Sequence, residues 1–288
     1  MSASLRERPT LMAALLILGL LATLALVLPL LAPHDPTATS LRLRLRPPAW
    51  IERGLPGHWL GTDHLGRDVL SRMLNGARIS VVVGLSVVVL AGSFGTLIGL
   101  IAGFIGGRTD AVLMRLVDMN IAFPGLLLAL LILAVVGPGL IPVILVLSVN
   151  GWMIFARTVR GLVLTQRALP YVEAAILTGC RRRTVIAEHI LPNLAAPLLT
   201  LGVLEFARVV LAEAALSFLG LGVQPPLVSW GLDVAAGRNY LSNAWWLVVV
   251  PGAAIALTVL GLNLLAGRLR IALDPREREK RFAARARA

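Results

Sequence analysis

The sequence has few of the residues that carry covalent and metal chemistry. Its 288 residues include a single cysteine, Cys180, which excludes an intramolecular disulfide and a cluster of thiolate metal ligands. Aromatic residues make up 5% and charged residues 15%, while 57% of the chain is hydrophobic and the mean hydropathy is +0.84. Such a chain is too apolar for an ordinary soluble domain, and its few aromatic residues do not suit a nucleic-acid surface. The composition predicts a protein that contacts membrane lipid and no nucleic acid.

Lysine is as rare as cysteine. The only lysine, Lys280, has no glycine near it, so the chain lacks the glycine-rich loop and lysine that bind ATP phosphates. The sequence also has no His-Glu-x-x-His motif and no nucleophile motif, and we therefore expect neither enzymatic activity nor a bound cofactor. His58, Asp63, His64 and Asp68 are close in sequence without the spacing typical of a metal site. We predict a solvated loop there and no metal.

Long apolar runs dominate the chain, and a helix of about 20 residues crosses the bilayer core of about 30 Å. The runs are Leu11 to Leu31, Ile79 to Gly103, Ala111 to Val136, Val143 to Phe155, Leu194 to Phe218 and Trp245 to Ala266. The first run is longer than a signal-peptide core and has no small-x-small cleavage site after it, so we expect a retained anchor. The sequence thus predicts an all-α integral membrane protein with about six transmembrane helices.

The basic residues indicate how these spans are oriented. Eighteen of the 27 lie in the two tails and in the loops after the second and fourth spans, whereas eight lie on the other side. Basic loops remain in the cytoplasm, so both termini are predicted to be cytoplasmic. Seven arginines lie between the first two spans, where the rule predicts fewer basic residues. We keep this orientation because the rule depends mainly on the tails and on residues near the ends of the spans.

Three regions follow from this topology. Residues 1–76 hold the first span and an extracytoplasmic segment, residues 77–267 form the transmembrane domain, and residues 268–288 form a basic cytoplasmic tail. Residues 41–46 alternate leucine and arginine, which predicts a short strand or an extended stretch.

Glycine and proline residues in and between the spans predict close packing, kinks and turns. Four glycines of the second span recur every four residues and form one helical stripe where a neighbouring backbone can pack closely. These are Gly95, Gly99, Gly103 and Gly107. Pro124 predicts a kink in the third span, and Pro138 and Pro142 predict a tight turn before the fourth.

The stretch between the fourth and fifth spans is polar, basic and too long for a simple connector. Glu173 to Leu177 predicts a short helix, Gly179 permits a turn, and Thr184 to Ile190 predicts a second short helix. Pro192 fits the first turn of the fifth span, where its missing N–H costs nothing. The stretch is predicted to project from the membrane as a helix-turn-helix, with two small alanines after Glu173 that let a partner surface approach.

This stretch resembles the cytoplasmic EAA loop of the membrane subunits of ATP-binding-cassette importers, which reads E-A-A, three residues, G, about nine residues, then I-x-L-P. The matching residues are Glu173, Ala174, Ala175, Gly179, Leu191 and Pro192. His189 stands where the general pattern has isoleucine, and this H-I-L-P-N form resembles the peptide and nickel permease branch. The resemblance implies that the EAA loop, residues 173–193, sits in a groove of an ATPase subunit, with Glu173 as a salt-bridge partner.

Residues 60–68 and 213–222 resemble the same branch, so the resemblance covers nearly the whole chain. The N-terminal anchor and its long outer segment are similar to the C-type subunit of a dipeptide or oligopeptide permease pair. The resemblance implies a type I importer fold in the bacterial cytoplasmic membrane. The implied partners are a homologous B-type permease, two ATPase subunits that use ATP and Mg, and an extracytoplasmic substrate-binding protein. Peptides are the expected cargo, and nickel, haem or glutathione-type molecules are alternatives.

Three charged residues interrupt the fifth span, where a charge is costly unless it faces a neighbour, a lumen or water. Glu205 and Arg208 are three residues apart and can pair, and Glu213 lies on much the same helical face. We expect this face to border the translocation pathway or the partner permease, with a purely structural pairing as the alternative. A hypothesis of another class is an ion-coupled secondary transporter that uses these carboxylates and Asp118, although two matched halves with broken helices are missing.

Overall fold

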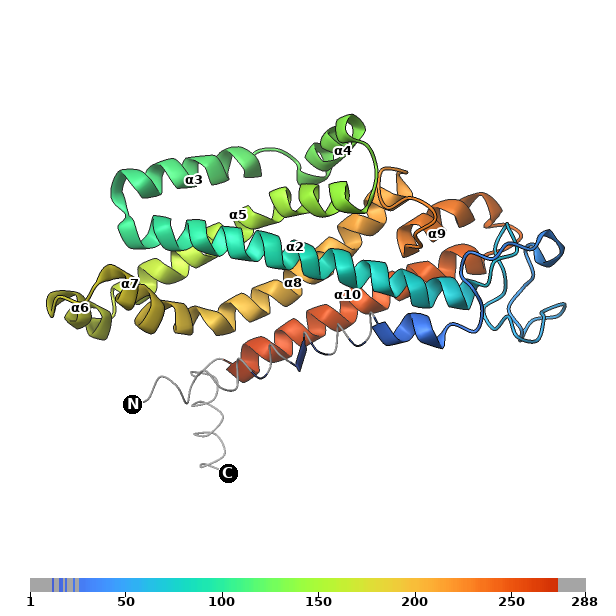
Figure 1. Cartoon of the computed structure of the whole chain (residues 1–288), viewed down its shortest axis with the longest axis horizontal. Coiled ribbons are helices and arrows are strands. Elements are labelled where there is room, and N and C mark those ends of the chain that lie inside the picture. The colour runs from blue at the N-terminus through green and yellow to red at the C-terminus, as the bar shows by residue number, and fades with distance from the viewer. Residues whose placement is uncertain (1–11, 13–15, 18, 20–22, 24–25, 274–288) are drawn as a thin grey trace, which may run out of the picture.

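The computed structural model of the chain describes residues 12, 16–17, 19, 23 and 26–273, which form an all-helical bundle (Figure 1). The longest helices run roughly along the long axis of the molecule and are α2 (Val69–Ile105), α5 (Leu140–Arg167), α8 (Leu191–Phe218) and α10 (Trp246–Leu273). Each is long and apolar enough to cross a membrane, α8 together with the turns that precede it. The described residues contain no strand, only one isolated bridge between Thr62 and Asp68.

The third expected span is broken. α3 (Gly107–Ile121) and α4 (Gly125–Val136) meet at 80°, with Pro124 directly before α4. The predicted kink at Pro124 is therefore confirmed, because proline cannot donate a hydrogen bond and its ring crowds the preceding turn. The described residues hold four spans, or five if this pair counts as one, and these correspond to five of the six expected runs. About half of the first run, Leu11 to Leu31, lies outside the described residues.

The tight turn predicted before the fourth span is confirmed. α4 ends at Val136 and α5 begins at Leu140, so only three residues join them. Many apolar side chains of α4 are exposed, including Val135 at 82%. In a membrane protein such a face contacts lipid or another subunit.

α2 packs along α5 through the predicted glycine stripe. A Cβ added to Gly99 would lie 2.5 Å from the carbonyl oxygen of Ala156, and one added to Gly95 or Gly103 would also overlap α5. Gly107 is not part of the stripe, because α2 has already ended and Gly107 begins α3. Because glycine has no side chain, the backbones of α2 and α5 come into direct contact. This close packing stabilises the helix pair in lipid, where the hydrophobic effect does not drive helices together.

Buried apolar clusters hold the bundle together at its centre and at both ends. The central cluster joins α2, α4, α5 and α8 and includes Val83, Leu133 and Leu216. One end joins the start of α2 to α9 (Trp230–Gly237) and α10. The other end joins α5 to the loop that precedes α8. The two ends therefore carry separate surfaces.

Residues 33–68 are here called the cap segment. Within it, residues 41–46 form neither the short strand nor the extended stretch that their alternation predicted. Leu41–Leu43 are a 3-10 turn, η2, which follows a similar turn, η1, at Leu28–Leu31. The backbone N–H of Arg46 donates to the Thr62 hydroxyl at 2.9 Å, and that hydroxyl donates to the carbonyl oxygen of Leu43. The Thr62 side chain thus binds the backbone at both Leu43 and Arg46 and holds the turn. Only Leu45 and Arg46 exchange backbone hydrogen bonds with Thr62 and Asp63, which is too short a pairing to form a strand.

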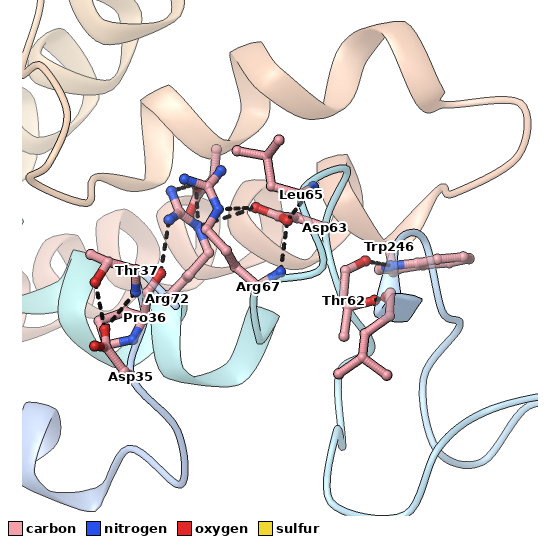
Figure 2. A network of polar contacts seen from close by, with 11 residues as sticks. Asp35, Pro36, Thr37, Thr62, Asp63, Leu65, Arg67, Arg72 and Trp246 are labelled. Carbon is pink, nitrogen blue, oxygen red and sulfur yellow. Dashed lines mark hydrogen bonds and ion pairs between the residues drawn. The ribbon is translucent and has the colours of Figure 1, made fainter. Parts of the chain in front are cut away.

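The solvated loop predicted around His58 and Asp68 is also wrong. Asp63 and Asp68 are 5% and 2% exposed. Asp63 accepts hydrogen bonds from the backbone N–H groups of Leu65 and Arg67 at 2.8 and 2.9 Å and from the Arg67 guanidinium at 2.6 Å (Figure 2). These hydrogen bonds replace the water molecules that the carboxylate loses on burial. A buried charge requires such partners to be stable.

The cap segment is fixed to the helices by long-range polar contacts. Arg72 in the first turn of α2 donates to the carbonyl oxygen of Pro36 at 3.1 Å, and the Trp246 indole N–H at the start of α10 donates to the carbonyl oxygen of Thr62 at 3.2 Å (Figure 2). Arg72 also forms an ion pair with Asp233 of α9. The cap segment, α9 and the ends of α2 and α10 therefore form one structural unit.

Candidate coupling loop and the charged residues of α8

The short helix predicted over Glu173 to Leu177 is present as α6 (Pro170–Leu177). It begins earlier than expected because Pro170 occupies its first turn, where the fixed φ of proline suits a helix. The Thr178 hydroxyl lies 3.0 Å from the carbonyl oxygen of Ala174 at its end, and Gly179 has a φ of +83°. The predicted turn is confirmed. Figure 1 places α6 at the end of the molecule opposite α9.

The second short helix, predicted over Thr184 to Ile190, is not a separate element. α7 (Arg182–Thr184), a π-helical turn η3 (Val185–Ile190) and α8 follow one another as one helical stretch, Arg182–Phe218. The wider π turn ends two residues before Pro192. We attribute it to this proline, which lacks an N–H and crowds the carbonyl four residues earlier. The hairpin therefore has one short arm and one arm that is the end of a spanning helix.

The base of the loop is well packed. Val172 of α6 is fully buried against Val163 of α5 and Ile190 of η3. The His189 ring lies over Tyr171, with ring centroids 6.4 Å apart. These contacts fix α6 to α5 and to η3.

Asn193 connects the two arms of the loop. Its amide donates to the Tyr171 hydroxyl at 3.2 Å and to the carbonyl oxygen of His189 at 2.7 Å. Sequence reasoning missed Tyr171, and the signal available was an aromatic residue with a polar tip immediately before the Glu173 helix.

The tip of α6 is exposed and apolar. Leu177 is 81% exposed and Ile176 is 42% exposed, and both Glu173 and Ala174 face outward. Within the described ranges no cationic group lies within ion-pair distance of Glu173. A ring of exposed arginines follows the turn, formed by Arg181, Arg182 and Arg183. Exposed leucine with unpaired charge around it is typical of a protein docking surface.

The residues predicted for the loop therefore divide into two groups. Glu173, Ala174 and Gly179 form the outward tip, and Ala175 is half-buried beneath them. The second group lies at the base: His189 and Pro192 are half-buried there, and Leu191 is 41% exposed. The structure thus brings the two ends of the motif together around one short helix.

In α8 the predicted pairing of Glu205 and Arg208 is present. The Arg208 Nε lies 2.7 Å from the Glu205 Oε2, and the Glu205 side chain is 8% exposed against 43% for Arg208. The Arg208 guanidinium lies beside Gly151 of α5. The half-exposed guanidinium marks the outward side of the pair.

Glu213 does not join this pair. It is 1% exposed, and its Oε1 accepts a hydrogen bond from the Ser217 hydroxyl at 2.7 Å. That hydroxyl in turn accepts the backbone N–H of Val223 at 3.1 Å. Glu213 therefore stabilises the turn at the end of α8, and in this conformation it borders no open face.

The bundle shares its architecture with a solved importer. The structure titled inward facing conformations of the MetNI methionine ABC transporter aligns with a TM-score of 0.52 at 18% identity, covering 67% of this chain and 94% of that one. At this identity the likeness concerns the fold. The bundle of spanning helices, with a short helix projecting between two of them, therefore has the fold of the membrane subunit of that importer.

The family follows from sequence comparison. Residues 95–279 match the family described as binding-protein-dependent transport system inner membrane component, and the chain belongs to this family. Residues 3–48 match the N-terminal TM domain of oligopeptide transport permease C.

Relatives match almost end to end. The di/tripeptide transport system permease protein DppC of Pseudomonas aeruginosa is 43% identical over 91% of this chain and 86% of its own length. The probable D,D-dipeptide transport system permease protein DdpC of Escherichia coli is 39% identical over 94% and 89%. The oligopeptide transport system permease protein OppC of Bacillus subtilis is 36% identical over 95% and 88%.

Proposed function

We propose that this chain forms one half of a pathway that carries peptides across the bacterial cytoplasmic membrane, with a homologous B-type permease as the other half. The names of the relatives, which are peptide permeases at 36% to 43% identity, support peptide as the cargo. Both termini lie in the cytoplasm, so the cap segment lies outside, where a substrate-binding protein delivers the cargo. The distribution of basic residues supports this orientation.

In this proposal the EAA loop, residues 173–193, docks on one of two ATPase subunits. The exposed tip of α6 is the main support for this docking role. Leu177 and Glu173 are exposed to solvent, whereas the buried Val172 fixes the helix to the bundle. An apolar side chain in a partner groove supplies affinity, and the carboxylate supplies a salt bridge. ATP and Mg bind the partner, and this chain carries out no hydrolysis.

Reconstitution tests the function directly. The permease pair, the ATPases and the binding protein are placed in vesicles with labelled di- and tripeptides. We expect uptake only when ATP and both ATPases are present, and competition by unlabelled peptide but not by nickel, haem or glutathione. Uptake driven by an ion gradient in vesicles without ATPases would instead identify a secondary carrier, and competition by nickel or haem alone would overturn the peptide assignment.

The Glu205–Arg208 pair is proposed to border the pathway or the partner permease, because the Arg208 side chain is 43% exposed on the outward side of a buried carboxylate. Glu205→Gln should lower peptide uptake while the pair still assembles. A variant that assembles and transports like the wild type would assign the ion pair to structure alone.

A further inference from the structure

Three potential metal ligands converge at the start of α2. His34 follows η1, His58 lies ten residues before the end of the cap segment, and Asp68 is the residue that caps α2. One ligand atom from each lies within 4.8 Å of the others. The two imidazole rings are stacked, with centroids 4.5 Å apart and planes 22° apart. The sequence hid this cluster because His34 is far from the other two residues along the chain.

Asp68 is already held in place by the protein. Its side chain is 1% exposed, and its Oδ2 accepts hydrogen bonds from the backbone N–H and the hydroxyl of Ser71 at 2.8 and 2.7 Å. The other oxygen, Oδ1, lies 2.9 Å from the Nδ1 of His58. The backbone N–H of His34 donates to the same Ser71 hydroxyl at 3.0 Å. One serine therefore positions both the carboxylate and the backbone that carries the second imidazole.

The simplest interpretation is a helix cap with a histidine hydrogen bond, which explains His58 but not His34. The Nδ1 of His34 is 3.8 Å from the Asp68 Oδ2, too far for a hydrogen bond. Two imidazole nitrogens and a carboxylate oxygen are the donor set of many three-residue zinc sites, whose fourth position is open to water. The His34 side chain is 40% exposed, which leaves such a position open to solvent.

The distances require only a small movement. Zinc bonds of about 2.0–2.2 Å place neighbouring ligand atoms about 3.3 Å apart in a tetrahedron. Asp68 and His58 are within this spacing, so the adjustment falls on the ring of His34. That ring is the most exposed of the three, and it must turn out of its stack with His58 to bring a nitrogen to the ion.

We propose that His34, His58 and Asp68 bind a zinc ion or another divalent transition-metal ion of similar coordination chemistry. The ion ties the chain after η1, the cap segment at His58 and the first turn of α2 to one point. It stabilises the cap segment because it binds the folded arrangement and not the separated pieces. This site does not depend on the proposed transport function.

The test uses the full-length chain in detergent, purified through a tag without histidine and carrying Cys180→Ser, so that the exposed thiol does not bind zinc. Zinc is titrated in competition with a chromophoric chelator. We expect one zinc ion per chain, and His34→Gln and His58→Gln should each weaken binding at least about tenfold, since even the loss of an indirect partner of a metal ligand has an effect of that size. His64→Gln, in the same cap segment, is the matched control and should bind as tightly as the parent.

Thermal unfolding gives a second readout. Zinc should raise the melting temperature of the parent and of His64→Gln but not of the two ligand variants. Asp68→Ala is not used because it also removes the cap of α2. The proposal is overturned if zinc does not bind saturably to the parent, or if both histidine variants keep the parent affinity.

Discussion

Arg72 and Asp233 form a buried ion pair between residues that are 161 positions apart in the sequence, and the Arg72 Nε lies 2.9 Å from the Asp233 Oδ1. Their side chains are 5% and 10% exposed. The pair fixes the first turn of α2 to α9, and Arg72 also holds the cap segment through Pro36. This one side chain therefore connects the cap segment to two helices.

Arg72→Met should destabilise the protein strongly. It leaves the Asp233 carboxylate buried without a counter-charge, and breaking a buried pair in this way costs about 3–5 kcal/mol. Thermal unfolding in detergent should show a large fall in melting temperature. The double variant Arg72→Met/Asp233→Leu should recover part of the loss, because no unpaired charge remains buried.

An exposed ion pair in the same chain serves as the control for Arg72. Arg157 pairs with Asp118, and both side chains are more than half exposed. Arg157→Met should cost no more than about 1 kcal/mol. Equal melting temperatures for the Arg72 and Arg157 variants would show that burial of the Arg72–Asp233 pair does not increase its contribution to stability.

Gly99→Ala should loosen the contact between α2 and α5. The added Cβ would lie 2.5 Å from the carbonyl oxygen of Ala156, so the two backbones must separate. Gly261→Ala in α10 meets nothing within 4 Å, and alanine favours a helix over glycine by up to about 1 kcal/mol. We expect a lower melting temperature for Gly99→Ala and an unchanged or higher one for Gly261→Ala. The reverse order would contradict the close packing of the glycine stripe.

Leu177→Asp should weaken association with the partner ATPase at least about tenfold, since it places a charge where an apolar side chain would be buried on docking. Co-purification and ATPase stimulation measure the effect. Leu41→Asp is the control, because Leu41 is 76% exposed in the cap segment, at the end of the molecule opposite α6. If the ATPase binds the Leu177 variant normally, the tip of α6 is not the docking surface.

His64 should make stability depend on pH. Burial lowers its pKa from the ordinary value of 6.5, the neighbouring Arg67, Arg72 and Arg44 lower it further, and Asp63 opposes them. The folded state therefore binds fewer protons than the unfolded state below about pH 6.5, and the protein loses stability as the pH falls through that range. Relative to His64→Gln, the parent should lose melting temperature between pH 7.5 and pH 5, measured with a metal chelator present. Parallel curves for the two proteins would exclude this role.

The sequence alone determined the features that depend on neighbours within one helix or turn. Apolar run length predicted the spans α2, α5, α8 and α10, four-residue spacing predicted the glycine stripe, and three-residue spacing predicted the Glu205–Arg208 pair. The α6 helix and the turn at Gly179 were predictable for the same reason, since backbone preference and helix geometry act over a few residues.

Only the tertiary structure decided what depends on residues far apart in the chain. The alternation over residues 41–46 predicted a short strand or an extended stretch, but Thr62 holds that segment in a turn. Glu213 shares a helix with Glu205, yet its contact with Ser217 and the turn at Val223 buries it inside the subunit. His34 joins His58 and Asp68 only because the cap segment folds back onto α2. Long-range contacts of this kind form between groups whose separation in sequence carries no periodic signal, so spacing cannot reveal them.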